Sequence, residues 1–292
     1  MNMDIEVSID RITIIAFDTG SFSEGLRDNI YIRERDFSRN FGFRYTYSGQ
    51  NGECIEIGDK GKVRLDFNPN NANMNEIGRI MRCLKYPHLT RLDIAVDYFG
   101  ENLSRVEWDS EKRRKRNYWI DADGTLETLY IGAPSSDKRF RIYNKELERK
   151  ENSHGEWEQD WEMHLDKHPL AKHGHWRVEV QKRFKERDNI LDPKEYFLPD
   201  LFDIVPLDRI DLSHLEGMDR VVVQGLISDP SLAKGLNKNT RAKYNKMIKE
   251  AKKQSPIALA VTPQQAYEKE KSRLADELTD LFAQSDRTMQ QI

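Results

Sequence analysis

The feature that most constrains this chain is the strict alternation of side chains in residues 139–145. Phe140 and Ile142 alternate there with cations and one tyrosine. Successive side chains of a β-strand point to opposite faces of its sheet. The segment therefore predicts a strand with one apolar face, joined through a tight turn to a strand that ends near residue 132. Its polar face carries Arg139, Arg141, Tyr143 and Lys145.

Two further alternating segments carry carboxylates on their polar faces. Residues 91–97 place two of them on one face, and residues 176–181 place a third on a face with Arg177. If the three strands are neighbours in one sheet, their polar faces coincide. We therefore expect a single open face that carries Asp93, Asp97, Glu179 and Tyr143.

This combination of side chains suits an attack on phosphate. A tyrosine hydroxyl, with a pKa near ~10, is a weak nucleophile unless nearby cations favour its anion. Carboxylates are the hard oxygen ligands that Mg²⁺ and Mn²⁺ prefer. We expect Tyr143 to be the nucleophile and the three acids to hold one of these metals. Lys145 or Arg141 would then stabilise the charge that develops on the phosphate or on the tyrosine.

Each of these residues also has a simpler interpretation. Tyr143 could be an ordinary side chain of an exposed sheet face. Each acid could be a solvated strand residue or the ion-pair partner of Arg91 or Arg177. These alternatives stay open at the level of single residues, and the argument depends on finding the groups together.

With these blocks, the chain resembles the Rep_trans family of rolling-circle replication initiators of plasmids and related mobile elements. The matching blocks are residues 91–97, 128–150 and 175–183, with a weaker fourth block at residues 231–250. The resemblance implies that Tyr143 is the DNA nucleophile, and it places the metal site less securely on Asp93, Asp97 and Glu179.

The resemblance also implies an activity. Such a protein nicks one strand at a double-strand origin, stays attached to the 5′ phosphate and later rejoins the strand. Its implied partners are origin DNA (duplex and locally single-stranded), a superfamily-1 helicase, a DNA polymerase and a second copy of itself. Alternatives are a relaxase for conjugative transfer, a regulator that binds DNA without chemistry, and a hydrolytic metal nuclease. The last is disfavoured by Gln181, where a lysine would be expected.

A looser resemblance to the HUH endonucleases draws attention to His173 and His175. In that group a bulky hydrophobic residue separates the two histidines that hold the metal, but here the residue between them is Gly174. We therefore expect the pair to be polar residues at the start of a strand or a surface near DNA.

Positive charge is concentrated in two places, although the net charge of the chain is only −3. One cluster is residues 112–116 and the other spans residues 234–253, where an amphipathic basic helix is expected. Local basic patches suit salt-dependent contacts with phosphates at a defined place. The expected DNA-binding residues are Arg113, Arg114, Lys115, Arg116, Lys238, Arg241, Lys243 and Lys246.

The patterns together predict an α+β fold, with a largely antiparallel sheet, an open active-site face and helices behind it. Helices are expected at residues 74–86 and 264–284, where apolar residues recur at helical spacing. We divide the chain into a catalytic domain, 1–225, and a basic helical region, 226–292, for DNA recognition and contacts with a partner or second copy.

The sequence also bears on the compartment. No apolar run approaches the ~20 residues of a membrane span, and the N-terminus does not have the pattern of a signal peptide. Cys54 and Cys83 lack the spacing of a metal site and are expected to be reduced. We expect a cytoplasmic protein without a membrane partner.

Overall fold

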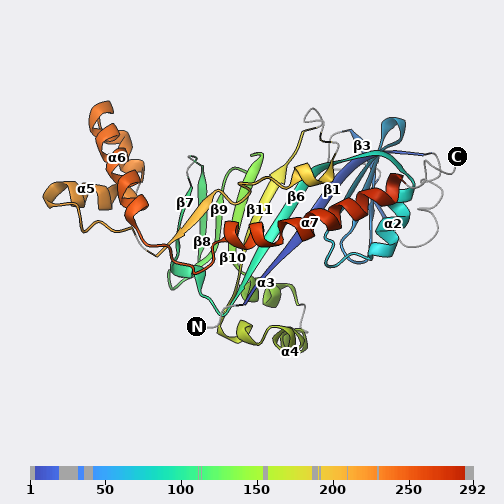
Figure 1. Ribbon diagram of the computed structural model, residues 1–292, viewed down its shortest axis with the longest axis horizontal. Helices are drawn as coiled ribbons and strands as arrows, with labels where there is room; N and C mark the ends of the chain where they lie inside the picture. The colour runs from blue at the N-terminus through green and yellow to red at the C-terminus, as the bar shows by residue number, and fades with distance from the viewer. Residues whose placement is uncertain are drawn as a thin grey trace. The chain divides into compact units, whose positions relative to one another are not determined.

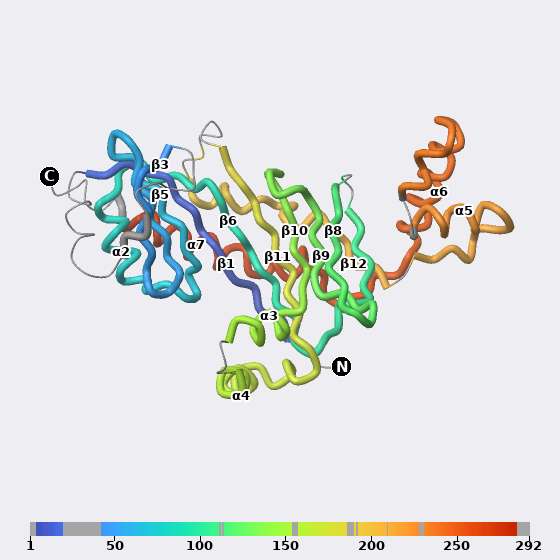
Figure 2. The backbone as a smooth tube through the Cα atoms, turned by 180° about the vertical axis from the view of Figure 1, so that it is seen from behind, coloured from blue at the N-terminus to red at the C-terminus, as the bar shows by residue number. Residues whose placement is uncertain are grey.

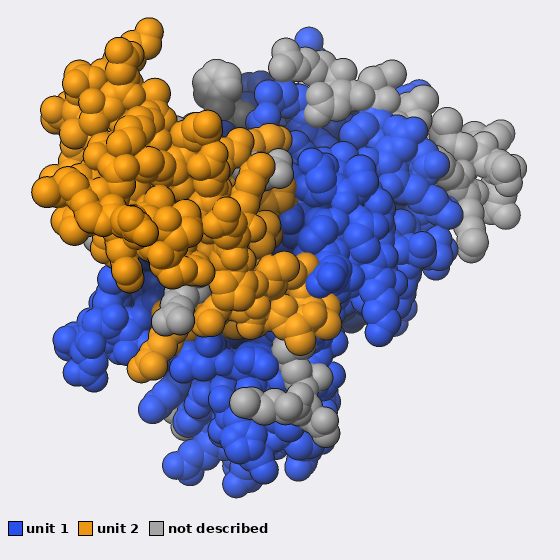
Figure 3. All heavy atoms as spheres, turned by 60° about the vertical axis from the view of Figure 1, so that its left-hand side comes forward, with its two compact units in different colours: residues 1–102, 114–202, 263–292 blue, residues 103–113, 203–262 orange. Residues whose placement is uncertain are grey.

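The computed structural model describes residues 4–19, 32–35, 42–110, 112, 114–153, 157–185, 190, 192–208, 210–228 and 230–286. The chain forms two compact units, which Figure 3 colours separately. The first unit comprises residues 1–102, 114–202 and 263–292, and the second comprises residues 103–113 and 203–262.

The first unit is built on a ten-stranded sheet in the order β2-β3-β4-β5-β1-β6-β11-β10-β9-β8. Every neighbouring pair is antiparallel. The strands are β1 (Asp4–Asp18), β2 (Ile32–Arg35), β3 (Phe43–Ser48), β4 (Cys54–Gly58), β5 (Lys62–Phe67), β6 (Leu84–Phe99), β8 (Arg116–Ile120), β9 (Leu126–Ile131), β10 (Lys138–Asn144) and β11 (His175–Arg183).

One face of the sheet is apolar and carries the core. Ile94, Phe140, Ile142, Val178 and Val180 are fully buried there, as the alternation predicts. The last helix, α7 (Pro263–Asp286), crosses this face along β1 and β6, and α2 (Met74–Arg82) packs against α7 (Figure 1). Figure 2 shows the opposite side, with the strands in front of α7. The predicted α+β fold, with an antiparallel sheet and helices behind it, is confirmed.

Helix α2 is shorter than the 74–86 expected from the periodicity. Asn73 caps its first turn by accepting hydrogen bonds from the backbone of Asn75 and Glu76. The helix stops at Arg82 because the chain from Leu84 onward already pairs with β1. Strand pairing takes precedence over the helical periodicity in these last residues.

Two helices follow β10 directly. Helix α3 (Lys145–Asn152) is capped by Asn144, whose side chain accepts a hydrogen bond from the backbone of Leu147 at 3.1 Å. Helix α4 (Trp157–Lys167) carries Trp157 and Trp161, whose rings stack on each other at 4.8 Å and are half-buried. Among the described residues of this unit are the short 3-10 helices η1 (Asp59–Gly61), η3 (Pro169–His173) and η5 (Pro193–Tyr196).

The second unit contains a two-stranded antiparallel sheet and two helices. The strands are β7 (Glu107–Ser110) and β12 (Ile204–Leu207), the helices α5 (Gly217–Ser228) and α6 (Lys238–Gln254), with 3-10 helices η2 (Leu103–Arg105) and η6 (Pro230–Gly235). Leu212, Val223, Leu226, Tyr244 and Ala251 form its buried cluster. The expected basic helix is thus present, and Tyr244 and Ala251 lie on its buried side.

The compact units do not coincide with the ranges 1–225 and 226–292 expected from the sequence. The last helix, residues 263–286, belongs with the sheet because Leu274, Leu278 and Leu281 are buried against it. The second unit begins instead at residue 203 and includes residues 103–113 from the middle of the chain. Among the described helices, none is long and apolar enough to cross a bilayer.

Candidate active site

The strand registers bring the predicted polar residues onto one face. Tyr143 pairs with Arg177 across β10 and β11, and Arg177 pairs in turn with Asp97 of β6. Residues directly opposite each other in an antiparallel pair point to the same face of the sheet. Because Glu179 lies two residues from Arg177, and Asp93 four from Asp97, all of them share the polar face. The predicted common face is present.

Tyr143 lies in a buried, cationic environment. Its side chain is 2% exposed, and the guanidinium of Arg141 covers its ring at 3.8 Å from the centroid. Burial raises the pKa of the Tyr143 phenol well above its ordinary value, and the charge of Arg177 opposes this rise most strongly. The cations are where the sequence predicts them. Desolvation nevertheless outweighs them, so the phenol is held in its neutral form.

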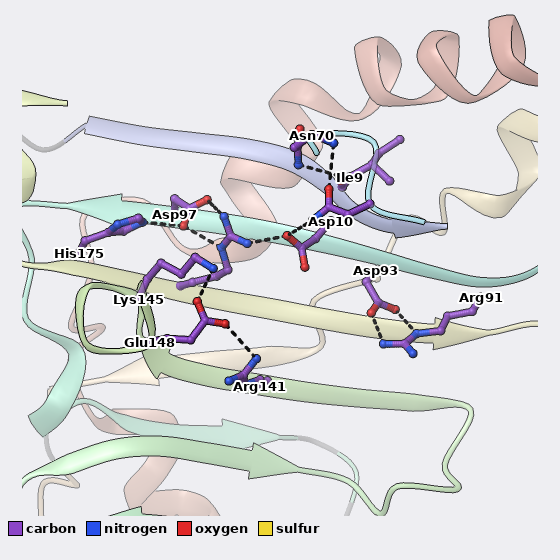
Figure 4. Close-up of polar contacts among 12 residues, drawn as sticks. Ile9, Asp10, Asn70, Arg91, Asp93, Asp97, Arg141, Lys145, Glu148 and His175 are labelled. Atoms are coloured by element: carbon purple, nitrogen blue, oxygen red, sulfur yellow. Dashed lines mark hydrogen bonds and ion pairs between the residues drawn. The ribbon is translucent and has the colours of Figure 1, made fainter. Parts of the chain in front are cut away.

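Lys145 and Arg141 both reach toward the same glutamate of α3. The Lys145 ammonium bonds Glu148 at 2.5 Å, and Arg141 lies 3.8 Å from the other carboxylate oxygen (Figure 4). The Lys145 ammonium is 5.6 Å from the centroid of the Tyr143 ring. Lys145 is the first residue of α3 and not the last of the strand, because Asn144 caps the helix at this point. Both cations remain beside the phenol.

Asp97 is fully engaged by neighbouring donors. Arg177 donates to both of its oxygens at 2.8 Å, and Nε2 of His175 lies 2.8 Å from one of them (Figure 4). The charge of Arg177, together with the hydrogen bonds from His175 and Arg177, overcomes burial and holds the pKa of this carboxyl well below its usual range. Asp97 is therefore the ion-pair partner of Arg177.

A chain of hydrogen bonds extends from Asp97 into the protein. Nδ1 of His175 is 3.1 Å from Nε2 of His164, and burial lowers the pKa of both rings. Because the Asp97 carboxylate only accepts, Nε2 of His175 carries the proton and Nδ1 accepts from His164. His175, 2% exposed, is therefore a buried support for Asp97. It is not a surface residue near DNA.

Asp93 and Glu179 are the two acids under electrostatic strain. They are diagonal neighbours on β6 and β11, since Gln181 is the residue directly opposite Asp93. Burial and nearby carboxylates raise the pKa of Asp93 to about 6 and that of Glu179 to about 7. Arg91 bonds Asp93 and partly offsets this effect (Figure 4). The two carboxylates repel each other and would gain from a nearby cation.

These groups line one cavity of about 560 Å³ on the polar face. Its walls include Tyr143, Arg141, Asp93, Glu179 and Asp10. Asp10 lies at a register shift between β1 and β6, an irregularity of the kind that redirects a side chain. Its carboxylate accepts from Arg177 at 2.5 Å and raises the pKa of both Asp93 and Glu179.

The donors of this cavity partly fit a divalent metal. Within the described ranges, no three His, Cys, Asp or Glu side chains are grouped closely enough to hold one ion. Mg²⁺, however, is often held by only one or two carboxylates, with water and substrate phosphate completing its shell. Glu179 meets that requirement. Both oxygens of Asp93 accept from Arg91, and those of Asp97 accept from Arg177 and His175, so either aspartate would have to give up an arginine contact to bind a metal.

Comparison with known proteins places this site in context. Two curated proteins, both named replication initiation protein and both from Staphylococcus aureus, are 32% and 31% identical to the chain over 206 and 196 residues. The matches cover 69% and 65% of this chain and 58% and 55% of the relatives. The chain is similar to these replication initiation proteins. It spans a little over half of their length.

Two other comparisons complete this result. No protein-family model matches the chain. A solved structure of a rolling circle replication initiator protein from Geobacillus stearothermophilus aligns with a TM-score of 0.45 and 15% identity, covering 95% of this chain and 97% of that one. The resemblance to replication initiators, drawn from the residue blocks, is confirmed by the staphylococcal relatives.

The basic residues expected to bind DNA are spread over both compact units of the chain. Arg114, Lys115 and Arg116 lie just before and at the start of β8, and Lys115 is the exposed one. Arg113 lies outside the described residues. The others lie on α6, and all four are exposed: Lys238, Arg241, Lys243 and Lys246.

The four predicted DNA-binding cations of α6 differ in their partners. The Lys243 ammonium bonds both oxygens of Asp219 at 2.9 and 3.0 Å, and Lys246 lies 3.8 Å from Glu250. Lys238 and Arg241 lie in the first turn of the helix, on its exposed surface. Of these four, Lys238 and Arg241 are therefore the best placed to meet a phosphate.

The sequence predicts no role in the site for three residues that shape it: Asp10, His164 and His175, although His175 begins a strand as expected. Asp10 lies in an alternating strand, but a register shift cannot be predicted from that alternation. His175 is in phase with Arg177 and Glu179, and this phase was the available signal for its place on the polar face. His164 comes from α4 and meets the site only through the fold.

Proposed function

We propose that this protein is a rolling-circle replication initiator that nicks one strand at a double-strand origin through Tyr143. The observation that carries the proposal is the convergence of Tyr143, Arg141, Asp93 and Glu179 on one cavity of the polar face. A buried phenol, cations and strained carboxylates together suit nucleophilic attack on a phosphodiester. The similarity to replication initiation proteins supports the biological setting.

The proposed step balances as a transesterification. The Tyr143 oxygen forms a bond to phosphorus, the bond from phosphorus to the 3′ oxygen breaks, and a 5′-phosphotyrosyl link remains. The phenol proton passes to a carboxylate of the cavity, and the departing 3′ oxygen takes a proton from water. Glu179 and Glu148 are the two acids whose charges act on Tyr143. Attack by the 3′ hydroxyl later reverses the step and rejoins the strand.

The other residues of the site have supporting roles in this proposal. Arg141 and Lys145, both within reach of the phenol ring, stabilise the negative charge that develops on the phosphate. Glu179, joined by Asp93 once Asp93 releases Arg91, would hold Mg²⁺ or Mn²⁺, which when bound would polarise the scissile phosphate. Asp97 instead fixes Arg177 beside Tyr143.

We propose origin DNA as the substrate, with duplex recognised by the exposed cations of α6 and by the segment around Lys115. A locally single-stranded region of the same DNA would enter the cavity beside Tyr143. The further partners are a superfamily-1 helicase loaded at the nick, a DNA polymerase that extends the 3′ end, and a second copy of the protein.

The experiment is an adduct assay on supercoiled plasmid that carries this gene and its flanks. With Mg²⁺ or Mn²⁺, wild-type protein is expected to relax the plasmid and to remain bound to DNA after denaturation. Tyr143→Phe should abolish the adduct and leave duplex binding nearly unchanged. Tyr130→Phe is the matched control, since Tyr130 lies on the adjacent strand β9 beside Arg141.

Two outcomes of this assay would contradict the proposal. Relaxation without an adduct would indicate hydrolysis, in which water and not Tyr143 attacks the phosphate. Equal loss of duplex binding and adduct in Tyr143→Phe would mean that the tyrosine has a structural role.

A further inference from the structure

A second, smaller cavity lies on the same polar face, farther along β10 from Tyr143. It has a volume of about 170 Å³. Arg139 and Arg141 of β10, Gln181 of β11 and Tyr130 of β9 line it. Arg141 lines this cavity as well as the larger one, so the two are neighbours.

Three hydrogen-bond donors in the walls of this cavity have no partner in the described structure. They are Nε of Arg139, Nε of Arg141 and Nε2 of Gln181, all buried from solvent. Gln181 is only 8% exposed, so its amide cannot turn freely to water. Buried donors in folded proteins are nearly always paired, because an unpaired one carries its full desolvation cost. Three such donors around one cavity indicate a ligand that accepts hydrogen bonds.

The chemistry of the walls identifies the kind of ligand. The guanidinium of Arg139 stacks on the ring of Tyr130 at 4.0 Å, which fixes its plane, and arginine in a fixed plane suits the oxygens of a phosphate. A nucleobase would present donors as well as acceptors, whereas a phosphodiester presents acceptors alone. The volume is also below the roughly 300 Å³ at which small-molecule sites begin. One phosphate group is a better match than a nucleoside.

Two other residues that line the cavity, Arg91 and Glu179, also affect the binding of a phosphate. Arg91 is bonded to Asp93, so its charge is already partly neutralised. Glu179 would repel a phosphate as a carboxylate, but the guanidinium groups of Arg139 and Arg141 line the same cavity and set two positive charges against its one negative charge.

The position of the cavity relative to Tyr143 matches a neighbouring nucleotide. Arg139 lies four residues from Tyr143 on one strand, about 13 Å at the usual rise of a β-strand. An extended single strand covers that distance in one or two nucleotides. We propose that the second cavity binds a phosphodiester group of the DNA strand, next to the one that Tyr143 attacks. This inference rests on the proposed function and adds a subsite to it.

The test measures binding on a Tyr143→Phe background, so that cleavage cannot interfere. The ligand is the single-stranded oligonucleotide from the gene's flanks that this protein binds most tightly, prepared with one neutral methylphosphonate linkage at each position in turn. One linkage is expected to weaken binding about tenfold or more. In the Arg139→Met and Gln181→Met variants the same linkage should have no further effect.

Controls separate the cavity from general charge and from folding. Lys182→Met removes a cation from the next position of β11, on the opposite face of the sheet. The neutral linkage should weaken its binding as much as it weakens the binding of the parent, which is the Tyr143→Phe protein. Gln181→Met removes a donor that has no partner, so its melting temperature should not fall. Equal responses of parent and cavity variants at every linkage would overturn the inference.

A measurement with inorganic phosphate distinguishes a site for a DNA phosphodiester from a site for free phosphate. If phosphate raises the melting temperature of the parent and not of Arg139→Met, while no single linkage matters, the cavity is a site for free phosphate and the inference fails. An adduct assay on the same oligonucleotide with Tyr143 present tests the proposed function separately. If an adduct forms but no neutral linkage weakens binding, only the subsite is contradicted. If one neutral linkage weakens binding but no adduct forms, only the nicking activity is contradicted.

Discussion

Tyr143 combines two properties that work against each other. Burial raises the pKa of its phenol, whereas Arg177 and Arg141 favour its anion. In the protein without DNA the phenol therefore keeps its proton. In the proposed reaction, activation would require a group that takes the proton or a cation that joins the site. The same environment would then keep Tyr143 unreactive until DNA fills the cavity.

The raised pKa of Glu179 predicts the pH dependence of nicking. Whether Glu179 holds a metal or accepts the phenol proton, it must be a carboxylate, and that form is populated above its pKa of about 7. The nicking rate should therefore rise through about pH 7 and level off above it. Single-turnover rates across the neutral range measure this. A flat profile in wild-type protein, or an unchanged rise in Glu179→Gln, would contradict the assignment.

Asp97 is predicted to matter for stability and for the position of Arg177. Asp97→Asn leaves Asp10 as the remaining carboxylate partner of Arg177. The free energy of unfolding should therefore fall, but by less than the roughly 3–5 kcal/mol expected when a buried charge loses every partner. The folded-state pKa of Asp97 is depressed, so its stabilisation is present above about pH 4 and is lost as the pH falls further.

Urea unfolding at neutral and acidic pH checks this prediction. The difference in stability between wild type and Asp97→Asn should narrow as the pH falls. A variant as stable as wild type at neutral pH would show that the Arg177–Asp97 pair contributes little.

At the scale of elements, the strand register assembles the site. The alternation in residues 91–97, 139–145 and 176–181 correctly predicts which side chains share a face, because the period of a strand is fixed by its backbone. Alternation does not determine which polar residues touch. Asp93 bonds Arg91 of its own strand, whereas Asp97 bonds Arg177 of the next strand. The register shift at Asp10 is also invisible in the sequence pattern.

The junction between β10 and α3 provides a test at this scale. Asn144 caps α3, whose first turn carries Lys145 and Glu148 beside Tyr143. Asn144→Ala should destabilise the protein by about 1 kcal/mol, the usual effect of losing such a cap. It should also slow nicking, because the Lys145 ammonium loses its fixed position. Asn144→Asp, which can still cap the helix, should restore both quantities in unfolding and adduct assays. Failure of Asn144→Asp to do so would argue against a capping role.

At the scale of the whole molecule, the proposed catalytic residues and the basic helix α6 lie in different compact units. The cavity belongs to the first unit and α6 to the second. The sequence separates these two regions only approximately. The boundary at residue 225 follows the change in composition, whereas the observed units follow the packing of α7 on the sheet.

This division predicts separable effects on DNA binding. Lys238→Met and Arg241→Met should each reduce the slope of log affinity against log salt by about 1, if each cation contacts a phosphate of duplex DNA. Lys243→Met should have a smaller effect, because Asp219 already neutralises that charge. Cleavage of a single-stranded oligonucleotide should be unchanged in all three. Equal slopes in wild type and the three variants would remove α6 from the DNA interface.

The central claim is that Tyr143 becomes covalently joined to DNA, and peptide mapping of the adduct tests it most directly. Wild-type protein is incubated with its plasmid and Mg²⁺ or Mn²⁺, the DNA is digested to a short remnant, and proteolytic fragments are analysed by mass spectrometry. The account predicts a nucleotide remnant on the peptide that contains Tyr143, attached through the tyrosine oxygen. A remnant on any other residue, or nicked DNA without a modified peptide, would contradict it.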